Sequence, residues 1–244
     1  IFGISLNTVI TFLGAITAVI LLVFRDTILG FVTGIHVSTS KNLKIGDWIG
    51  IPKYNIEGNI QDINLLTTKI VNFDKTISTI PTYDLLSTEI RNHQVMYEGS
   101  SRRIKRSIYF NIKSFKFVDD EFYEKVKDIN LISEYLDRKL REIAESKKNI
   151  PHAERIINGQ QLTNIGLFRN YVLNYLKNNP KVDQDEIVLV RQLEISPQGM
   201  PLEIYCFANK AELVDYERIQ ADIFDHILTA AQEFDLEIMQ VAKA

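Results

Sequence analysis

The first 24 residues of the chain form an apolar run without a charged side chain. Ile1 to Phe24 reads IFGISLNTVITFLGAITAVILLVF, and Arg25 and Asp26 end it abruptly. As an α-helix this run is roughly 36 Å long, and the hydrocarbon core of a bilayer is about 30 Å thick. The pattern therefore predicts a transmembrane helix. The alternatives are a core helix of a soluble protein and a targeting segment, although a signal peptide needs a basic start and a small-residue cleavage site, and neither is present.

One stripe of this predicted helix carries small and weakly polar residues. Such residues let helices approach closely, because packing and not water drives helix association in lipid. Two interpretations follow: a plain helix–helix contact, or a ring of helices around a pore with the small residues between neighbours or facing the lumen. Periodicity does not choose between them. The stripe consists of Asn7, Thr11, Gly14, Ala15, Ala18 and Leu22.

A second, shorter apolar helix is predicted directly after the charged pair. Asp26 suits the N-cap of a helix that begins at Thr27 and runs to about Val37. This segment lacks Lys, Arg, Asp and Glu, and it contains Gly30-x-x-x-Gly34, a spacing that permits close backbone contact. The Arg25-Asp26 pair thus separates a spanning helix from an amphipathic one.

Basic residues flank the predicted span on one side only. Arg25, Lys41 and Lys44 follow the apolar run, so the positive-inside tendency places the rest of the chain in the cytoplasm. A single cysteine, Cys206, excludes an internal disulfide and agrees with a reducing compartment. The net charge of −3 gives no global basic field for nucleic acid. The chain begins at Ile1 and not at Met, so we expect a fragment with further membrane helices upstream.

Residues 44–92 read as a series of short strands. Gly46-Asp47 predicts a turn into a strand at Trp48–Ile51, and the β-branched runs 67–73 and 76–80 predict a hairpin joined at Asp74-Lys75. Pro81 stops the second of these strands. Four or five short strands in about 50 residues predict a small barrel or a curled sheet. RNA-binding barrels share this pattern, but aromatic residues for stacking and a basic surface are scarce here.

The remainder of the chain alternates predicted strands and amphipathic helices, in an order that favours a split βαβ sandwich with an inserted stretch at about 145–168. The turn Ser196-Pro197-Gln198-Gly199 predicts a hairpin. The expected strands are 104–112, 187–195, 202–208 and 236–241, and the expected helices are 119–148, 170–178 and 216–234.

This order of elements resembles the small-conductance mechanosensitive (MscS-like) channels of bacteria. The resemblance rests on VFRDTILGFVTGI, which is similar to the kinked pore helix of that family, and on LKIGDWIGIPKYNIEGNIQDINLLTTKIVNFDKTISTIPTYDLL, which is similar to its β domain. Later stretches, RRIKRSI, LTNIGLFRNYVLNYLKNNP, VRQLEISPQGMPLEIYCF and IQADIFDHI, resemble the miniconductance (YbdG-like) branch. The resemblance covers essentially the whole chain.

The resemblance implies a fold, an activity and a set of residue roles. It implies a tension-gated ion channel of the bacterial inner membrane, multi-pass, with its C-terminal domain in the cytoplasm. Copies of the chain would form a homo-oligomer, commonly a heptamer, in contact with lipids and permeating ions. The fold would be a kinked transmembrane pore helix, a small all-β Sm-like barrel and an α+β ferredoxin-like domain. The expected domains are 1–25 (pore helix), 26–43 (amphipathic helix), 44–103 (β domain) and 104–244 (cytoplasmic α/β domain with a helical insertion).

The pore roles implied by the resemblance fall on residues of the apolar helices. Leu22 would form the constriction with Ala18 one turn earlier, and Arg25-Asp26 would be the kink. The sequence departs from the better-studied branch in two ways: the helix is less rich in alternating Gly and Ala, and the kink is a charged pair instead of a polar residue and glycine. Packing between neighbours would use Gly14 and Ala15 in the first helix and Gly30 and Gly34 in the second.

Candidate catalytic chemistry is sparse. Asp222 and His226 share a helix face and suit an acid/base pair, a metal site or a hydrogen-bonded surface pair. Phosphate-binding, redox and nucleophile-elbow motifs are absent from the sequence, so we expect no enzyme activity, metal or cofactor. Cys206, in a predicted strand, is expected to be a small core residue. A basic cluster would touch phosphate or lipid headgroups, pair with another subunit or remain in a solvated loop; it comprises Arg102, Arg103, Lys105 and Arg106.

Three function classes remain from the sequence. The first is a tension-gated channel. The second is a membrane-anchored osmotic sensor or scaffold with little ion conduction, suggested by the charged helical insertion. The third is a membrane-tethered enzyme, disfavoured by the missing catalytic constellation.

Overall fold

The computed structural model describes residues 5–39 and 42–240, so Lys41 and Val241 lie outside the described residues. The chain divides into two compact units, Ile1–Glu98 and Gly99–Ala244, which are described separately below. Each unit has its own hydrophobic core.

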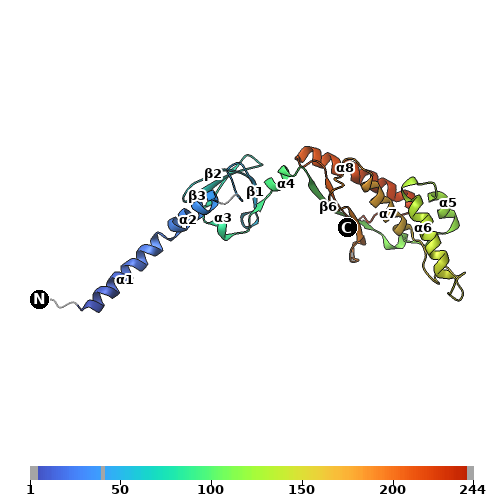
Figure 1. The fold of residues 1–244 in the computed structure, drawn as a ribbon, viewed down its shortest axis with the longest axis horizontal. Helices are drawn as coiled ribbons and strands as arrows, with labels where there is room; N and C mark the ends of the chain where they lie inside the picture. The colour runs from blue at the N-terminus through green and yellow to red at the C-terminus, as the bar shows by residue number, and fades with distance from the viewer. Residues whose placement is uncertain (1–4, 40–41, 241–244) are drawn as a thin grey trace. The chain divides into compact units, whose positions relative to one another are not determined.

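The N-terminal unit begins with two successive helices, α1 and α2 (Figure 1). Ser5 caps α1 by accepting a hydrogen bond from the backbone N–H of Thr8 at 3.2 Å. Phe24 is the one residue between the helices, and its carbonyl still accepts from the N–H of Ile28 at 2.9 Å. The prediction that Asp26 caps a helix starting at Thr27 is wrong, because α2 already includes Arg25 and holds Asp26 in its first turn.

An antiparallel five-stranded sheet forms the rest of this unit, with the order β4-β3-β2-β1-β5. Alternate positions of the strands point into one core, which Val37 of α2 joins. The predicted turn at Gly46, whose φ is +96°, and the predicted hairpin across Asp74-Lys75 are both confirmed. The buried core isoleucines are Ile49, Ile51, Ile60, Ile70 and Ile80. The elements are α1 (Leu6–Val23), α2 (Arg25–Thr39), β1 (Trp48–Ile51), η1 (Pro52–Tyr54), β2 (Ile56–Ile63), β3 (Thr67–Asn72), β4 (Ile77–Pro81), α3 (Asp84–Ser87), β5 (Arg91–Asn92) and α4 (Gln94–Glu98).

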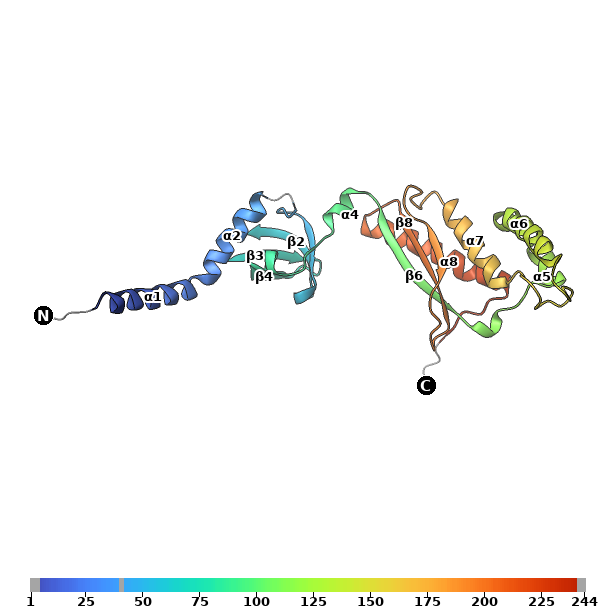
Figure 2. The same ribbon diagram turned by 60° about the horizontal axis from the view of Figure 1, so that its bottom comes forward.

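The C-terminal unit is a three-stranded antiparallel sheet of order β6-β8-β7, with α7 and α8 against one face (Figure 2). The face toward the helices supplies much of the core, and the hairpin predicted around Ser196–Gly199 is confirmed. Cys206 on β8 is fully buried, and burial raises the pKa of its thiol to about 12, as expected for an inert core residue. The elements are β6 (Arg102–Phe110), η2 (Ile112–Ser114), α5 (Asp120–Val126), α6 (Asn130–Lys147), α7 (Asn164–Lys177), β7 (Leu189–Gln192), β8 (Met200–Ala208), α8 (Leu213–Ala230) and η3 (Ala231–Phe234).

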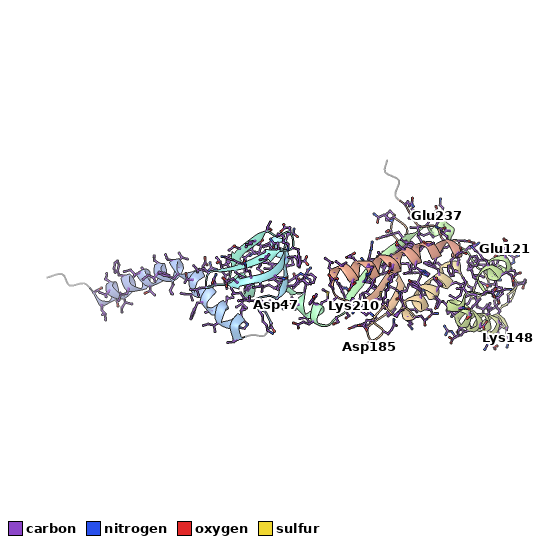
Figure 3. All side chains as sticks on the ribbon, turned by 90° about the horizontal axis from the view of Figure 1, so that it is seen from above. Asp47, Glu121, Lys148, Asp185, Lys210 and Glu237 are labelled. Atoms are coloured by element: carbon purple, nitrogen blue, oxygen red, sulfur yellow. The ribbon has the colours of Figure 1, made fainter. Side chains whose placement is uncertain are left out.

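Several predicted elements of this unit end elsewhere. The strand expected over 236–241 is, in its described part, a single bridge between Ile238 and Phe110. The helix expected over 119–148 is two helices, α5 and α6, and Ile132 is the fully buried anchor while Leu140 is exposed. Charged side chains cover the outer surface of these two helices, where Figure 3 labels Glu121 and Lys148.

Asn164 connects three segments of the C-terminal core. Its side chain is fully buried, and its amide donates to the carbonyls of Ser114 and Phe234 at 2.9 and 3.1 Å. Its Oδ1 accepts from the N–H groups of Lys116 and Ile165 at 3.0 and 2.9 Å. The full set of bonds explains how a polar group is tolerated there.

Candidate pore-lining helix and its contact with the β domain

α1 has the length and surface of a membrane-spanning helix. Its 18 residues have a mean hydropathy of 2.3 and extend about 27 Å. None of its residues is buried, so the core-helix alternative is wrong for α1 as described. Leu22, for example, is 72% exposed. An apolar surface of this size requires lipid or other copies of the chain around it.

The residues expected to pack or line a pore lie together on α1. Gly14, Ala15, Ala18 and Leu22 are all exposed, and a Cβ added at Gly14 would meet no atom within 4 Å. Within the described part of the chain this stripe is therefore open for a contact with another helix. Its roles in packing and constriction remain predictions.

The break between α1 and α2 lies one residue before the predicted kink. Phe24 is the break residue, while Arg25 and Asp26 are exposed residues of the first turn of α2. An acidic residue suits that position because the N-terminal end of a helix carries partial positive charge. The kink role of the charged pair stays a prediction.

Gly30 and Gly34 have different surroundings, although the sequence pairs them. A Cβ added at Gly30 would lie 2.0 Å from the carbonyl oxygen of Leu65, in the connection between β2 and β3. The same addition at Gly34 would meet nothing within 4 Å. Gly30 therefore lets α2 approach the β domain of its own chain, whereas Gly34 makes no comparable contact among the described residues.

α2 buries one face and exposes the other. Thr33 and Val37 follow Gly30 at helical spacing, and all three are buried. Phe31 and Ile35 on the other face are more than half exposed. An apolar groove of about 820 Å³ beside α2 is lined by Phe31, Ile35, Val37, Leu43, Ile63 and Leu65.

Sequence reasoning missed the residues that support this contact. The contact residue Leu65 lies in a connection, and a polar cluster around Thr82 supports that connection. The T-I-P-T stretch that ends at Thr82 was a signal of the β domain, but nothing in its pattern indicates which carbonyl its last hydroxyl meets.

A buried carboxylate lies two residues after Thr82. Asp84 is 1% exposed and accepts hydrogen bonds from Tyr54, from Lys53 at 3.2 Å and from Ser87 at 3.0 Å. Burial alone would raise the pKa of Asp84, but the bonds from Tyr54, Lys53 and Ser87 outweigh it and hold the pKa below its ordinary value of 3.8. Asp84 thus fixes the β1–β2 connection to α3.

The candidate pair on α8 is split between two other partners. Asp222 forms an ion pair with Lys181 at 2.6 Å. The Nε2 atom of His226 lies 2.7 Å from the hydroxyl of Tyr171, and its ring stacks on Tyr175 with centroids 4.1 Å apart. These contacts support a structural role for both residues.

The basic cluster belongs to strand β6 and not to a loop. The guanidinium groups of Arg102 and Arg106 lie over the rings of Tyr216 and Phe224, at 4.4 and 4.8 Å from the centroids. Lys105 lies 3.8 Å from the buried carboxylate of Glu203. Arg103 lies over Tyr205 at 5.9 Å. The cluster is therefore engaged by side chains of its own unit.

Two family models match the chain, and together they cover more than half of it. The model described as the β-domain of mechanosensitive ion channels matches residues 26–95. The model described as the C-terminal part of the mechanosensitive ion channel MscS matches residues 159–238. Segment 96–158, which contains β6, α5 and α6, lies outside both matches.

Curated relatives agree with these matches. The low conductance mechanosensitive channel YnaI of Escherichia coli is 24% identical over 231 residues, which is 95% of this chain and 53% of that protein. The small-conductance mechanosensitive channel MscMJ of Methanocaldococcus jannaschii is 31% identical over 90 residues, 37% of this chain and 25% of that protein. The chain thus spans about half the length of YnaI. The YbdG-like branch stays a prediction.

Solved structures share the fold. MSL1 of Arabidopsis thaliana superposes with a TM-score of 0.64 at 15% identity, over 98% of this chain and 68% of that one. MscS of Helicobacter pylori in its closed state superposes with a TM-score of 0.57 at 16% identity, over 99% of this chain and 74% of that one. The fold is thus that of MscS-like proteins, with a β domain and a C-terminal domain.

The family and its relatives are membrane ion channels and not enzymes. α1, uncharged and fully exposed, is the candidate span among the described residues. The chain belongs to the MscS family of mechanosensitive ion channels.

Proposed function

We propose that copies of this chain form a mechanosensitive ion channel, opened by bilayer tension to release ions and small solutes under osmotic stress. The observation that carries the proposal is the direct passage from α1, an uncharged helix with no buried residue, into α2, which is fixed on the β domain. A spanning helix continuous with a soluble support suits a pore whose inner end is held from the cytoplasmic side.

The gate in this proposal is a ring of Leu22 side chains, one from each copy, with Ala18 one turn away. An apolar constriction offers ions no substitute for their hydration shell and blocks conduction by dewetting. Gly14 and Ala15 pack between neighbouring copies, because small residues allow close backbone approach in lipid. Arg25 and Asp26 lie at the bend between α1 and α2.

Tension acts on this gate through the area of the protein in the membrane. The open state occupies the larger area, so tension shifts a two-state equilibrium toward it. Copies of α1 that tilt or move apart widen the ring at Leu22 and let water return. Contacts that hold α2 to the β domain, such as that of Gly30, influence how readily α1 moves.

The assembly is proposed to be a heptamer in the bacterial inner membrane, with further spans upstream and both soluble domains in the cytoplasm. The β domain is proposed to be an Sm-like barrel. The order β6-β8-β7, with Ile238 bridging to Phe110 on the other side of β6, supports a ferredoxin-like C-terminal domain whose fourth strand is reduced to one bridge. Counting the copies in a single-particle image tests the heptamer.

Patch recording from liposomes tests the activity. Purified full-length protein should give unitary currents that appear only when suction is applied to the patch, and protein-free liposomes should stay silent. A silent bilayer at tensions near membrane rupture, with correctly assembled protein present, would contradict the channel and favour an osmotic sensor.

A further inference from the structure

The N-terminal unit buries four polar side chains among its described residues: Thr33, Thr68, Thr82 and Asp84. Burying a hydroxyl costs free energy unless it forms hydrogen bonds. Asp84 is explained by its three donors. Thr68 and Thr82, both 0% exposed, meet each other instead, with their hydroxyl oxygens 3.2 Å apart.

The hydrogen-bond directions of this threonine pair follow from its geometry. Thr82 donates its hydroxyl hydrogen to the backbone carbonyl of Asn64 at 2.7 Å. A threonine hydroxyl has one hydrogen, so Thr68 must be the donor in the contact between the two. The backbone N–H of Thr82 also donates to the carbonyl of Leu66 at 3.0 Å. Thr82 thus binds both ends of the connection 64–66 between β2 and β3.

The middle residue of that connection is the one that α2 contacts. The carbonyl of Leu65 faces Gly30, at the place where a Cβ would lie only 2.0 Å away. A continuous line of contacts therefore leads from the end of β4, through Thr82 and the connection 64–66, to Gly30 in α2. Backbone groups make the α2 contact, so its geometry depends on how the connection is held.

We propose that Thr82, oriented by Thr68, is a positioning residue for the pore helix: its hydrogen bond to Asn64 fixes the connection on which α2 rests. Loss of this bond loosens α2 from the β domain while the strands remain paired. The effect on gating rests on the proposed channel function; the effect on α2 does not.

Hydrogen exchange on the full-length assembly in lipid nanodiscs tests the positioning. Thr82→Val keeps a similar shape and removes the hydroxyl, and one lost hydrogen bond of this kind should speed exchange of the backbone amides of 30–37 and 64–66 by roughly fivefold. Thr82→Ser should restore the original rate. Thr79→Val, an exposed position on the same strand, is the matched control and should change nothing. Equal exchange in Thr82→Val and the original protein would overturn the proposal.

A milder variant guards against a general loss of folding. Thr68→Val removes the donor to Thr82 but leaves the bond from Thr82 to Asn64, so it should give a smaller acceleration at the same amides. Uniform acceleration across all strands of the β domain in both variants would show that the pair stabilises the domain as a whole, which contradicts a positioning role.

A double-mutant cycle tests whether Thr82 acts on gating through Gly30. Thr82→Val alone should shift the tension of half-maximal opening, and it should add no shift in a Gly30→Ala background, where the contact with Leu65 is already disrupted. Fully additive shifts would overturn the proposed route. If no variant conducts, the channel proposal fails, and the exchange rates still decide whether Thr82 positions α2.

Discussion

α1 and α2 are successive apolar helices, yet they face different surroundings. α1 buries no residue, whereas α2 buries Gly30, Thr33 and Val37 against the β domain of its own chain. Both lack a charged residue in their interiors. Similar apolar patterns therefore serve two purposes: α1 offers its whole surface to lipid or other copies, and α2 uses one face to attach the spanning helix to a soluble support.

A charge placed in each helix should separate the two environments most strongly. Ile16→Asp puts a carboxylate near the middle of α1, where the bilayer imposes a cost of about 3 kcal/mol, and should sharply reduce the amount of protein recovered from the membrane. Val32→Asp, on the exposed face of α2, should leave recovery nearly unchanged. Membrane fractionation of full-length protein measures both, and equal losses would mean that the helices do not differ in this way.

A polar side chain at the proposed constriction should have the next largest effect. Leu22→Asn gives water a partner in the narrow passage, so patches should conduct at low tension where the original protein is closed. Leu21→Asn changes the neighbouring position and should leave the closed state intact. Unchanged closed-state conductance and threshold in Leu22→Asn would remove Leu22 as the constriction.

The two glycines of α2 offer a matched pair of smaller substitutions. Gly30→Ala brings a methyl group against the carbonyl of Leu65 and should cost about 1–3 kcal/mol through the shift it forces. Gly34→Ala has open space and should be neutral or slightly stabilising, because alanine favours helix by up to about 1 kcal/mol. Thermal unfolding of full-length protein compares them. The reverse order would show that Gly30 does not attach α2.

The smallest expected effect concerns the support beneath α2. The pKa of Asp84 is lower in the folded protein than its ordinary value of 3.8, so its carboxylate contributes stability above about pH 4 and loses it as the pH falls through the folded pKa. Asp84→Asn should therefore lower the unfolding temperature at pH 7 and differ less from the original protein at pH 3. Glu89→Gln, whose carboxylate is exposed, is the control. A difference independent of pH would contradict this assignment.

The elements that sequence predicted well are those with local patterns. α1 follows from its uncharged run, β1 was predicted with its observed bounds, and the hairpin of β3 and β4 follows from β-branched residues around Asp74-Lys75. Each pattern needs only neighbours along the chain. The break between α5 and α6 was missed, because charged residues on both sides continue the helical pattern.

The missed parts of the site depend on contacts between distant segments. Gly30 was recognised as a contact residue, but its partner Leu65 lies 35 positions later in a connection without a distinctive composition. Thr82 was recognised only as part of a strand end. Its role follows from the carbonyl of Asn64, which a sequence pattern does not reveal.

The most direct test of the pore uses a cysteine at Leu22. The single native cysteine, Cys206, is fully buried with a thiol pKa of about 12, so it should not react with a water-soluble thiol reagent. In patches of Leu22→Cys opened by tension, the reagent should block the current, and Leu13→Cys should be unaffected. A current in Leu22→Cys that persists after exposure to the reagent in the open state would contradict the account that α1 lines the pore.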